Sequence, residues 1–148
     1  MTEEMRRYVA LNEDDRSLSI ASDRLPTPGA EELLIEVAAA GINRADLMQR
    51  KGLYPPPPDA SPIMGLEVAG TVIGCGEAVQ DFAIGDRVCA LTHGGGYASH
   101  AVAPCGQTFK TPEDLTDAQA AALPEALLTL WHNIFQLCAL QTGENILI

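Results

Sequence analysis

The stretch from residue 62 to residue 88 reads PIMGLEVAGTVIGCGEAVQDFAIGDRV and decides the fold. Glycines at positions 65, 70, 74, 76 and 85 interrupt a run rich in valine, isoleucine and alanine. Glycines this dense in β-prone sequence mark tight turns, bulges or close approaches of backbone, because glycine accepts conformations that other residues avoid. We therefore expect two strands, over residues 68–73 and 86–91, in a small and sharply bent β-barrel.

Strand signals continue on both sides of this stretch. An apolar run at 32–40 stops at Gly41, which favours a strand over a helix. Two β-prone pieces flank an acidic turn at 12–15 and predict an opening hairpin. A short helix over 44–51, closed by Gly52, should follow the strand at 32–40. The remaining expected strands are 7–11 and 17–21 in the hairpin, then 97–103 and 108–110.

The composition changes near residue 115 from β-rich to helical sequence. Thr116 and Gln119 form a candidate capping box, and Pro124 is well placed to begin a second helix over 125–137. The apolar residues of that helix are expected to face a core: Leu127, Leu130, Trp131, Ile134 and Phe135. Residues 144–148 read as an apolar strand without a partner, so we expect a truncated chain with domains at 1–115 and 116–148.

Composition and charge exclude several classes of function. The chain of 148 residues carries 20 acidic and 9 basic residues, a net charge of −11, which repels nucleic acid and anionic lipid surfaces. Its four cysteines form no C-x-x-C pair, as expected for reduced thiols in a cytoplasmic protein. No apolar run approaches the ~20 residues of a membrane helix.

Tyr54 is the first candidate site residue. It precedes four consecutive prolines, 55–58, which hold the backbone near polyproline II geometry and keep the segment out of a sheet. Tyr54 either packs against these prolines or stands at a binding site. The histidines at 93, 100 and 132 each stand alone in the sequence, and a satisfied surface or core role is expected for them before a role as a ligand.

Six motifs in order resemble one family, the zinc-free quinone oxidoreductases of the medium-chain dehydrogenase/reductase superfamily, particularly the branch of the tumour-suppressor-inducible quinone oxidoreductase. They are GINRAD at 41–46, RKGLYPPP at 50–57, GLEVAG at 65–70, GDRV at 85–88, GGGYA at 94–98 and LPEALLT at 123–129. The resemblance implies a mainly β fold with α: a GroES-like β-barrel over 1–115, then helices and the first strand of a truncated Rossmann domain. It also implies hydride transfer from NADPH or NADH to a quinone or enone in a homodimeric full-length enzyme, with this chain alone inactive.

The same resemblance bears on metal binding. Zinc-dependent alcohol dehydrogenases of the superfamily carry ligands at the positions matching Asn43, Leu66 and Glu125. Leucine has no donor atom and asparagine is a weak zinc ligand, so a shell of three protein ligands and water cannot form. We expect no metal.

The resemblance assigns roles to four residues. Asn43 is expected to orient the nicotinamide and the acceptor oxygen, because an amide both donates and accepts; a purely structural role in its loop remains the alternative. Tyr54 would shape the quinone pocket and Thr129 would approach the nicotinamide. Met48, which stands where some relatives carry a second pocket tyrosine, is expected to contact the cofactor. Two acidic residues, Asp46 and Glu67, are expected to pair with Arg44 or Arg87.

Two rival functions share parts of this sequence pattern. A chaperonin-like cofactor has the same barrel but is shorter and lacks the helical stretch at 116–138. A fragment of a zinc-dependent alcohol dehydrogenase would contain near-stoichiometric zinc.

Overall fold

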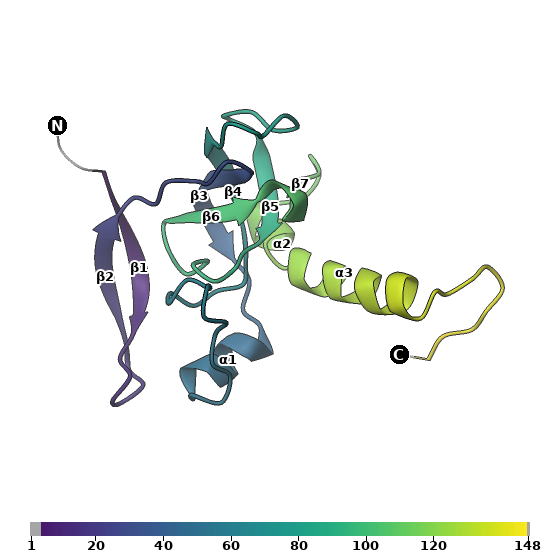
Figure 1. Ribbon diagram of the computed structural model, residues 1–148, viewed down its shortest axis with the longest axis horizontal. Coiled ribbons are helices and arrows are strands. Elements are labelled where there is room, and N and C mark those ends of the chain that lie inside the picture. The colour runs from purple at the N-terminus through teal and green to yellow at the C-terminus, as the bar shows by residue number, and fades with distance from the viewer. Residues whose placement is uncertain (1–3, 148) are drawn as a thin grey trace.

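The structure, a computed structural model, describes residues 4–147 and is dominated by a five-stranded antiparallel sheet (Figure 1). The strands lie in the order β6-β3-β4-β5-β7 and the sheet curls into half of a barrel. Its strands are β3 (Glu32–Ala40), β4 (Glu67–Cys75), β5 (Arg87–Leu91), β6 (His100–Pro104) and β7 (Thr108–Lys110). The expected mainly β fold with helices is confirmed.

The expected opening hairpin is present as a separate two-stranded sheet. Strands β1 (Met5–Leu11) and β2 (Leu18–Arg24) are both longer than predicted. The strand predicted at 97–103 starts only at His100, because its first residues pair with the hairpin instead: Tyr8 bridges to Ala98, and the Val9 N–H donates to the Tyr97 carbonyl oxygen at 2.8 Å.

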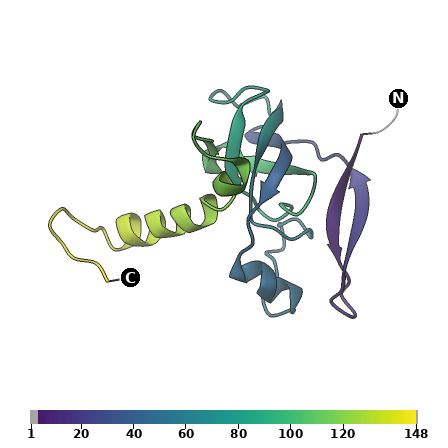
Figure 2. The same ribbon diagram turned by 180° about the vertical axis from the view of Figure 1, so that it is seen from behind.

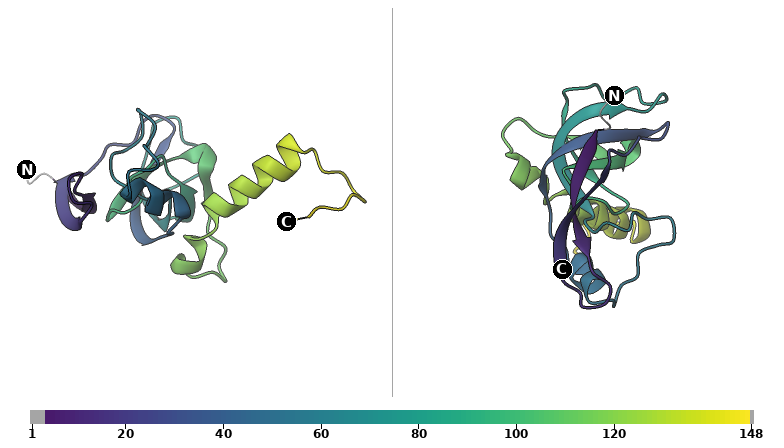
Figure 3. Two further views of the ribbon diagram at one scale, coloured as in Figure 1. Left: turned by 90° about the horizontal axis from the view of Figure 1, so that it is seen from below. Right: turned by 90° about the vertical axis from the view of Figure 1, so that its left-hand side faces the viewer.

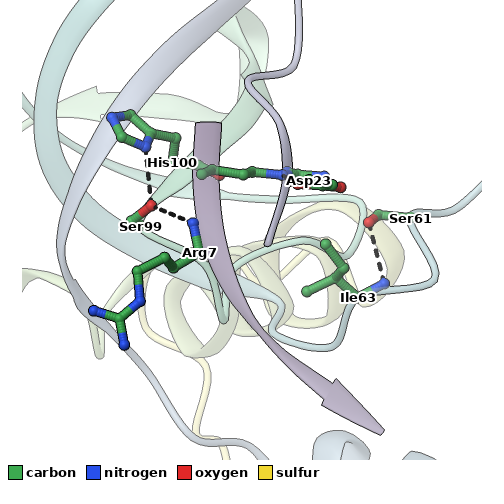
Figure 4. Close-up of polar contacts among 7 residues, drawn as sticks. Arg7, Asp23, Ser61, Ile63, Ser99 and His100 are labelled. Carbon is green, nitrogen blue, oxygen red and sulfur yellow. Dashed lines mark hydrogen bonds and ion pairs between the residues drawn. The ribbon is translucent and has the colours of Figure 1, made fainter. Parts of the chain in front are cut away.

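Ser99 fastens the hairpin to the sheet (Figure 4). Its backbone N–H donates to the Arg7 carbonyl oxygen at 2.7 Å, and its hydroxyl oxygen accepts from the Arg7 N–H at 3.0 Å. The same hydroxyl lies 3.0 Å from Nδ1 of His100. His100 is therefore held at the edge of the sheet by a local contact.

The curl of the sheet originates in the pairing of β3 with β4. This ladder shifts register between Leu34 and Ile35 and again between Val37 and Ala39. Such bulges bend and twist the strand that carries them. Between the bulged positions, β4 approaches so closely that a Cβ on Gly70 would collide with the carbonyl oxygen of Glu36. Glycine is required here for close approach.

The two faces of the sheet bury different residues. The inner face carries the main core, formed by Leu33, Ile35, Val68, Val72, Val88, Ala90, Ala101 and Ala103. On the opposite face Ala69 and Cys89 pack against α2 (Asp117–Ala120). The predicted capping box of α2 is confirmed, since Thr116 and Gln119 exchange hydrogen bonds between their side chains and backbones.

The C-terminal helix corrects two expectations. Helix α3 (Pro124–Leu130) continues as the π-helix η2 (Trp131–Leu137), and the two form one rod that projects from the sheet (Figures 2 and 3). The expected core role of its apolar residues is wrong for this chain, because Leu127, Leu130, Trp131 and Phe135 are exposed. No strand forms at 144–147, where Leu147 is 98% exposed, and Ile148 lies outside the described residues.

The short helix α1 (Arg44–Arg50) is confirmed, and it ends where Gly52 adopts a positive φ of 73°. Within residues 4–147 no helix is long and apolar enough to cross a membrane.

The crowding at Gly70 predicts a large difference between two glycine-to-alanine variants. Gly70→Ala should lower the free energy of unfolding by about 3 kcal/mol, because the methyl group displaces the β3 backbone. Gly106→Ala is the matched control, since a Cβ there meets no atom within 4 Å and should leave stability nearly unchanged. Urea unfolding of both variants measures the difference, and equal midpoints would contradict the close approach.

Candidate functional site

Asn43 stands at the start of α1, directly after β3. The Gly41 N–H donates to the Glu67 carbonyl oxygen at 3.1 Å and extends the strand pairing by one residue. The backbone N–H of Asn43 then donates to Oδ2 of Asp46 at 2.8 Å, so the third residue of the helix caps its beginning. The position of Asn43 is thus fixed by both a strand end and a helix start.

Glu67 lies behind Asn43 and is 3% exposed. Nδ2 of Asn43 donates to Oε1 of Glu67 at 2.9 Å, and the backbone N–H of Glu125 donates to Oε2 at 2.9 Å. The expected pairing of Glu67 with Arg44 or Arg87 is wrong: Glu67 is satisfied by these two N–H donors, and Arg87 pairs with Asp117 at 2.7 Å. Asp46 was expected to pair with an arginine as well, but its Oδ2 accepts the capping hydrogen bond from the Asn43 N–H instead.

Tyr97 faces the same buried acidic region, and sequence reasoning missed it. Its hydroxyl oxygen and Oδ1 of Asp46 are both buried without a hydrogen bond among the described residues. Burial raises the pKa of the Tyr97 hydroxyl, and the nearby Asp46 and Glu67 carboxylates raise it further. The protein keeps this phenol neutral. A tyrosine after a run of glycines gives no sequence signal that its hydroxyl lies near two buried carboxylates.

A cavity of about 260 Å³ opens beside this cluster. Tyr54, on the proline segment, and Thr129, on α3, both line it, so the structure brings together two residues that the sequence assigned to one site. Asn43 does not line the cavity; it is linked to the cavity wall through Glu67 and Glu125. The other lining residues are Gln49, Pro56, Pro57, Ala60, Ser61, Leu66, Leu91, Thr92, His93, Gly94 and Glu125.

Met48 and His93 differ in their relation to the cavity, and His93 has the satisfied surface position that the sequence suggested. Met48 is half-buried on α1 and lies outside the lining of the 260 Å³ cavity. His93, interpreted above as an isolated histidine, lines the cavity, and its Nε2 lies 3.3 Å from Oδ2 of Asp59. This His93–Asp59 pair lies at a solvent-exposed part of the wall, and neither residue carries a sequence motif that could have marked it.

Two of the three positions aligned with zinc ligands lie at the cavity. Leu66 and Glu125 line it, and Asn43 is already bonded to Glu67. Over residues 4–147 no group of three or more His, Cys, Asp and Glu side chains is arranged to hold a metal ion. The donor set at these positions is one carboxylate and one amide, which is poor for zinc.

Comparison with known proteins identifies the relatives of this chain. A profile of the family "Alcohol dehydrogenase GroES-like domain" matches residues 29–113. The human synaptic vesicle membrane protein VAT-1 homolog is 40% identical over 123 residues, which cover 83% of this chain and 31% of the relative. The chain therefore spans about a third of the length of that protein.

Solved structures with the same fold include enzymes. The CurK enoyl reductase matches with a TM-score of 0.80 and 29% identity over 94% of this chain and 45% of the other. A quinone oxidoreductase of Pseudomonas syringae matches with a TM-score of 0.77 and 29% identity, over 95% of this chain and 44% of the other. A mycobacterial protein solved in complex with NADPH matches with a TM-score of 0.77 and 30% identity, over 95% of this chain and 44% of the other.

The buried Tyr97 hydroxyl predicts a loss of stability at high pH. Its pKa is raised above the ordinary value of 10.0, so the unfolded chain releases this proton at a lower pH than the folded protein does. The free energy of unfolding should then fall above about pH 10, by at most about 1.4 kcal/mol per pH unit from this group.

Tyr97→Phe should remove this part of the fall, whereas Tyr54→Phe, at an exposed tyrosine, should leave it in place. Urea unfolding at about pH 8 and about pH 11 measures the slope for each variant. Equal slopes for wild type and Tyr97→Phe would count against a phenol held neutral by its surroundings.

Proposed function

The chain belongs to the family of alcohol dehydrogenase GroES-like domains, and from that premise we propose that it is the substrate-binding part of a longer NADPH-dependent enzyme. The proposed reaction is reduction of a quinone or an enone without a metal ion. The observation that carries the proposal is the cavity wall shared by Tyr54 and Thr129, with Leu66 at the position of a metal-binding side chain in zinc relatives.

The residues in and behind the cavity wall fit the nicotinamide end of the cofactor. A carboxamide needs one donor and one acceptor. After its bond to Glu67, Asn43 retains a second Nδ2 hydrogen, while its side chain also takes part in the capping box with the Asp46 backbone. The cavity of about 260 Å³ is small beside ligand pockets of roughly 300–1,000 Å³, so it suits a single ring. The mycobacterial neighbour binds NADPH, which supports the choice of cofactor.

The rest of the cofactor requires residues that this chain lacks. A glycine-rich loop directly after a strand normally binds the pyrophosphate, and residues 116–147 contain no such strand and loop. Because the chain spans 31% of the human relative, we assign pyrophosphate binding to a further domain of the whole protein.

Bound NADPH would supply the hydride, and the residues of this chain would orient the acceptor. Asn43 stands behind the cavity wall, linked to it through Glu67 and Glu125; its remaining Nδ2–H would donate to an acceptor oxygen placed beside it and stabilise the negative charge that develops there. Tyr54, on its stiff proline segment, closes one side of the cavity and excludes water from the ring. The Thr129 hydroxyl, on α3, supplies a further polar contact at the cofactor side.

The substrate class follows from the proposed chemistry. Without a metal to polarise a carbonyl, the acceptor must take up a hydride readily, as quinones and enones do. The names of two neighbours, a quinone oxidoreductase and an enoyl reductase, agree with this class.

Residues 1–148 alone should bind NADPH weakly. Contacts from Asn43 and Thr129 are largely cancelled by the translational and rotational cost of association, so we expect a dissociation constant in the millimolar range at best. Titration calorimetry measures this directly. Micromolar affinity for NADPH would mean that the phosphates bind within this chain. It would contradict the assignment of pyrophosphate binding to a further domain.

Asn43→Ala and Tyr54→Phe test the proposed site in the longer protein. Loss of an oriented donor should reduce kcat/KM for quinone reduction about 100- to 1,000-fold for Asn43→Ala, which corresponds to roughly 2.7 to 4 kcal/mol. The melting temperature should stay within a few degrees, which excludes unfolding as the cause. Unchanged turnover in both variants would leave these residues with structural roles only.

A further inference from the structure

The buried carboxylate of Glu67 touches two elements that the proposed site depends on. One oxygen accepts from the Asn43 side chain, before α1, and the other accepts from the Glu125 backbone, at the start of α3. A Cβ on Gly41 would collide with this carboxylate, so the strand end is shaped to receive it. Glu67 therefore lies where the strand end and the two helix starts meet.

The chemistry of a carboxylate dictates how Asn43 is turned. An ionised carboxylate only accepts hydrogen bonds, so it must face the NH₂ group of the asparagine and cannot face its oxygen. The alternative orientation would place Oδ1 against Oε1, two acceptors at hydrogen-bond distance. Oδ1 and the second Nδ2 hydrogen of Asn43 are consequently directed away from Glu67.

We propose that Glu67 is a positioning residue that fixes the side-chain amide of Asn43 in this one orientation. Its role in the reaction rests on the proposed function; the orientation itself does not. With the amide fixed, the second Nδ2 hydrogen of Asn43 always lies in the same place, and its oxygen faces the capping box at the start of α1. The Glu125 bond ties the same carboxylate to α3, the helix that carries Thr129.

Glu67→Gln separates positioning from a merely structural role. Glutamine has nearly the same volume, and its single oxygen can still accept from the Glu125 N–H. Its NH₂ group then faces Asn43, and two NH₂ groups cannot bond to each other. The Asn43 amide must then turn over or lose its partner. If Glu67 only filled space and capped α3, the substitution would leave the Asn43 amide nearly unchanged.

Nuclear magnetic resonance of the ¹⁵N-labelled chain, residues 1–148, reads the amide directly. In wild type the two Nδ2 hydrogens of Asn43 should be widely separated in chemical shift, and the bonded one should exchange with water at least about tenfold more slowly than the exposed Asn12 amide does. Asn43→Ala assigns these signals by removing them. Glu67→Gln should collapse the separation and abolish the slow exchange.

Glu32→Gln is the matched control, because Glu32 also accepts one backbone hydrogen bond, from Gly29, but lies at the opposite end of β3. It should leave the Asn43 signals unchanged. Asn43 signals that resemble those of Asn12 in wild type, or that survive Glu67→Gln in a folded spectrum, would overturn the proposal. Should Glu67→Gln fail to fold, the wild-type separation and exchange rate decide alone.

A double-variant cycle in the longer protein tests the consequence for turnover. If Glu67 acts through Asn43, adding Glu67→Gln to Asn43→Ala should change kcat/KM by less than about threefold. Losses that multiply in the double variant would show that Glu67 acts elsewhere and would overturn its positioning role. A wild-type protein without quinone or enone reductase activity would defeat the proposed function, while the amide signals would still decide the orientation.

Discussion

The pairing of β3 with β4 is the constraint on which the rest of the structure depends. Its two bulges curl the sheet, and the glycine at position 70 lets the strands approach closely enough for the curl. Its end places Gly41 beside Glu67, so the loop that carries Asn43 and the buried carboxylate emerge side by side. A straight ladder would leave the two apart, and the cavity would lose the hydrogen-bonded link between α1 and α3.

The region next to this ladder buries two carboxylates without a cation. A buried charge is costly unless hydrogen bonds replace its hydration. Glu67 meets this requirement with two N–H donors, and Asp46 meets it in part, through one capping bond and one oxygen without a partner. Such an arrangement stabilises little in itself. It holds backbone and side-chain donors in fixed places, as a binding site requires.

Sequence reasoning found most of the fold because its signals are local. Gly41, Gly52, Thr116 and Pro124 each act on their own turn or helix end, and the elements they delimit are where we expected them. The site was only partly predictable. Tyr54 and Thr129 meet at one cavity as expected, but the partners of Glu67 come from Asn43 and from the backbone of Glu125, and no charge pattern encodes a backbone donor. Tyr97 was missed because the two carboxylates near its hydroxyl, Asp46 and Glu67, come from distant parts of the sequence.

The apolar residues of α3 and η2 follow a pattern typical of a buried helix face, but no part of the described chain covers them. Their spacing predicted a core role that these residues do not have in this chain: Trp131 is 56% exposed and lines an apolar hollow of about 710 Å³ with Leu127 and Phe135. Exposed apolar area on this scale is unfavourable in water. Under the proposed function this face belongs to the contact with the cofactor-binding domain, on the helix that also carries Thr129. Helix α3 would then both line the cavity, through Thr129, and contact the domain that binds the cofactor. Glu67 would hold this helix in place relative to Asn43.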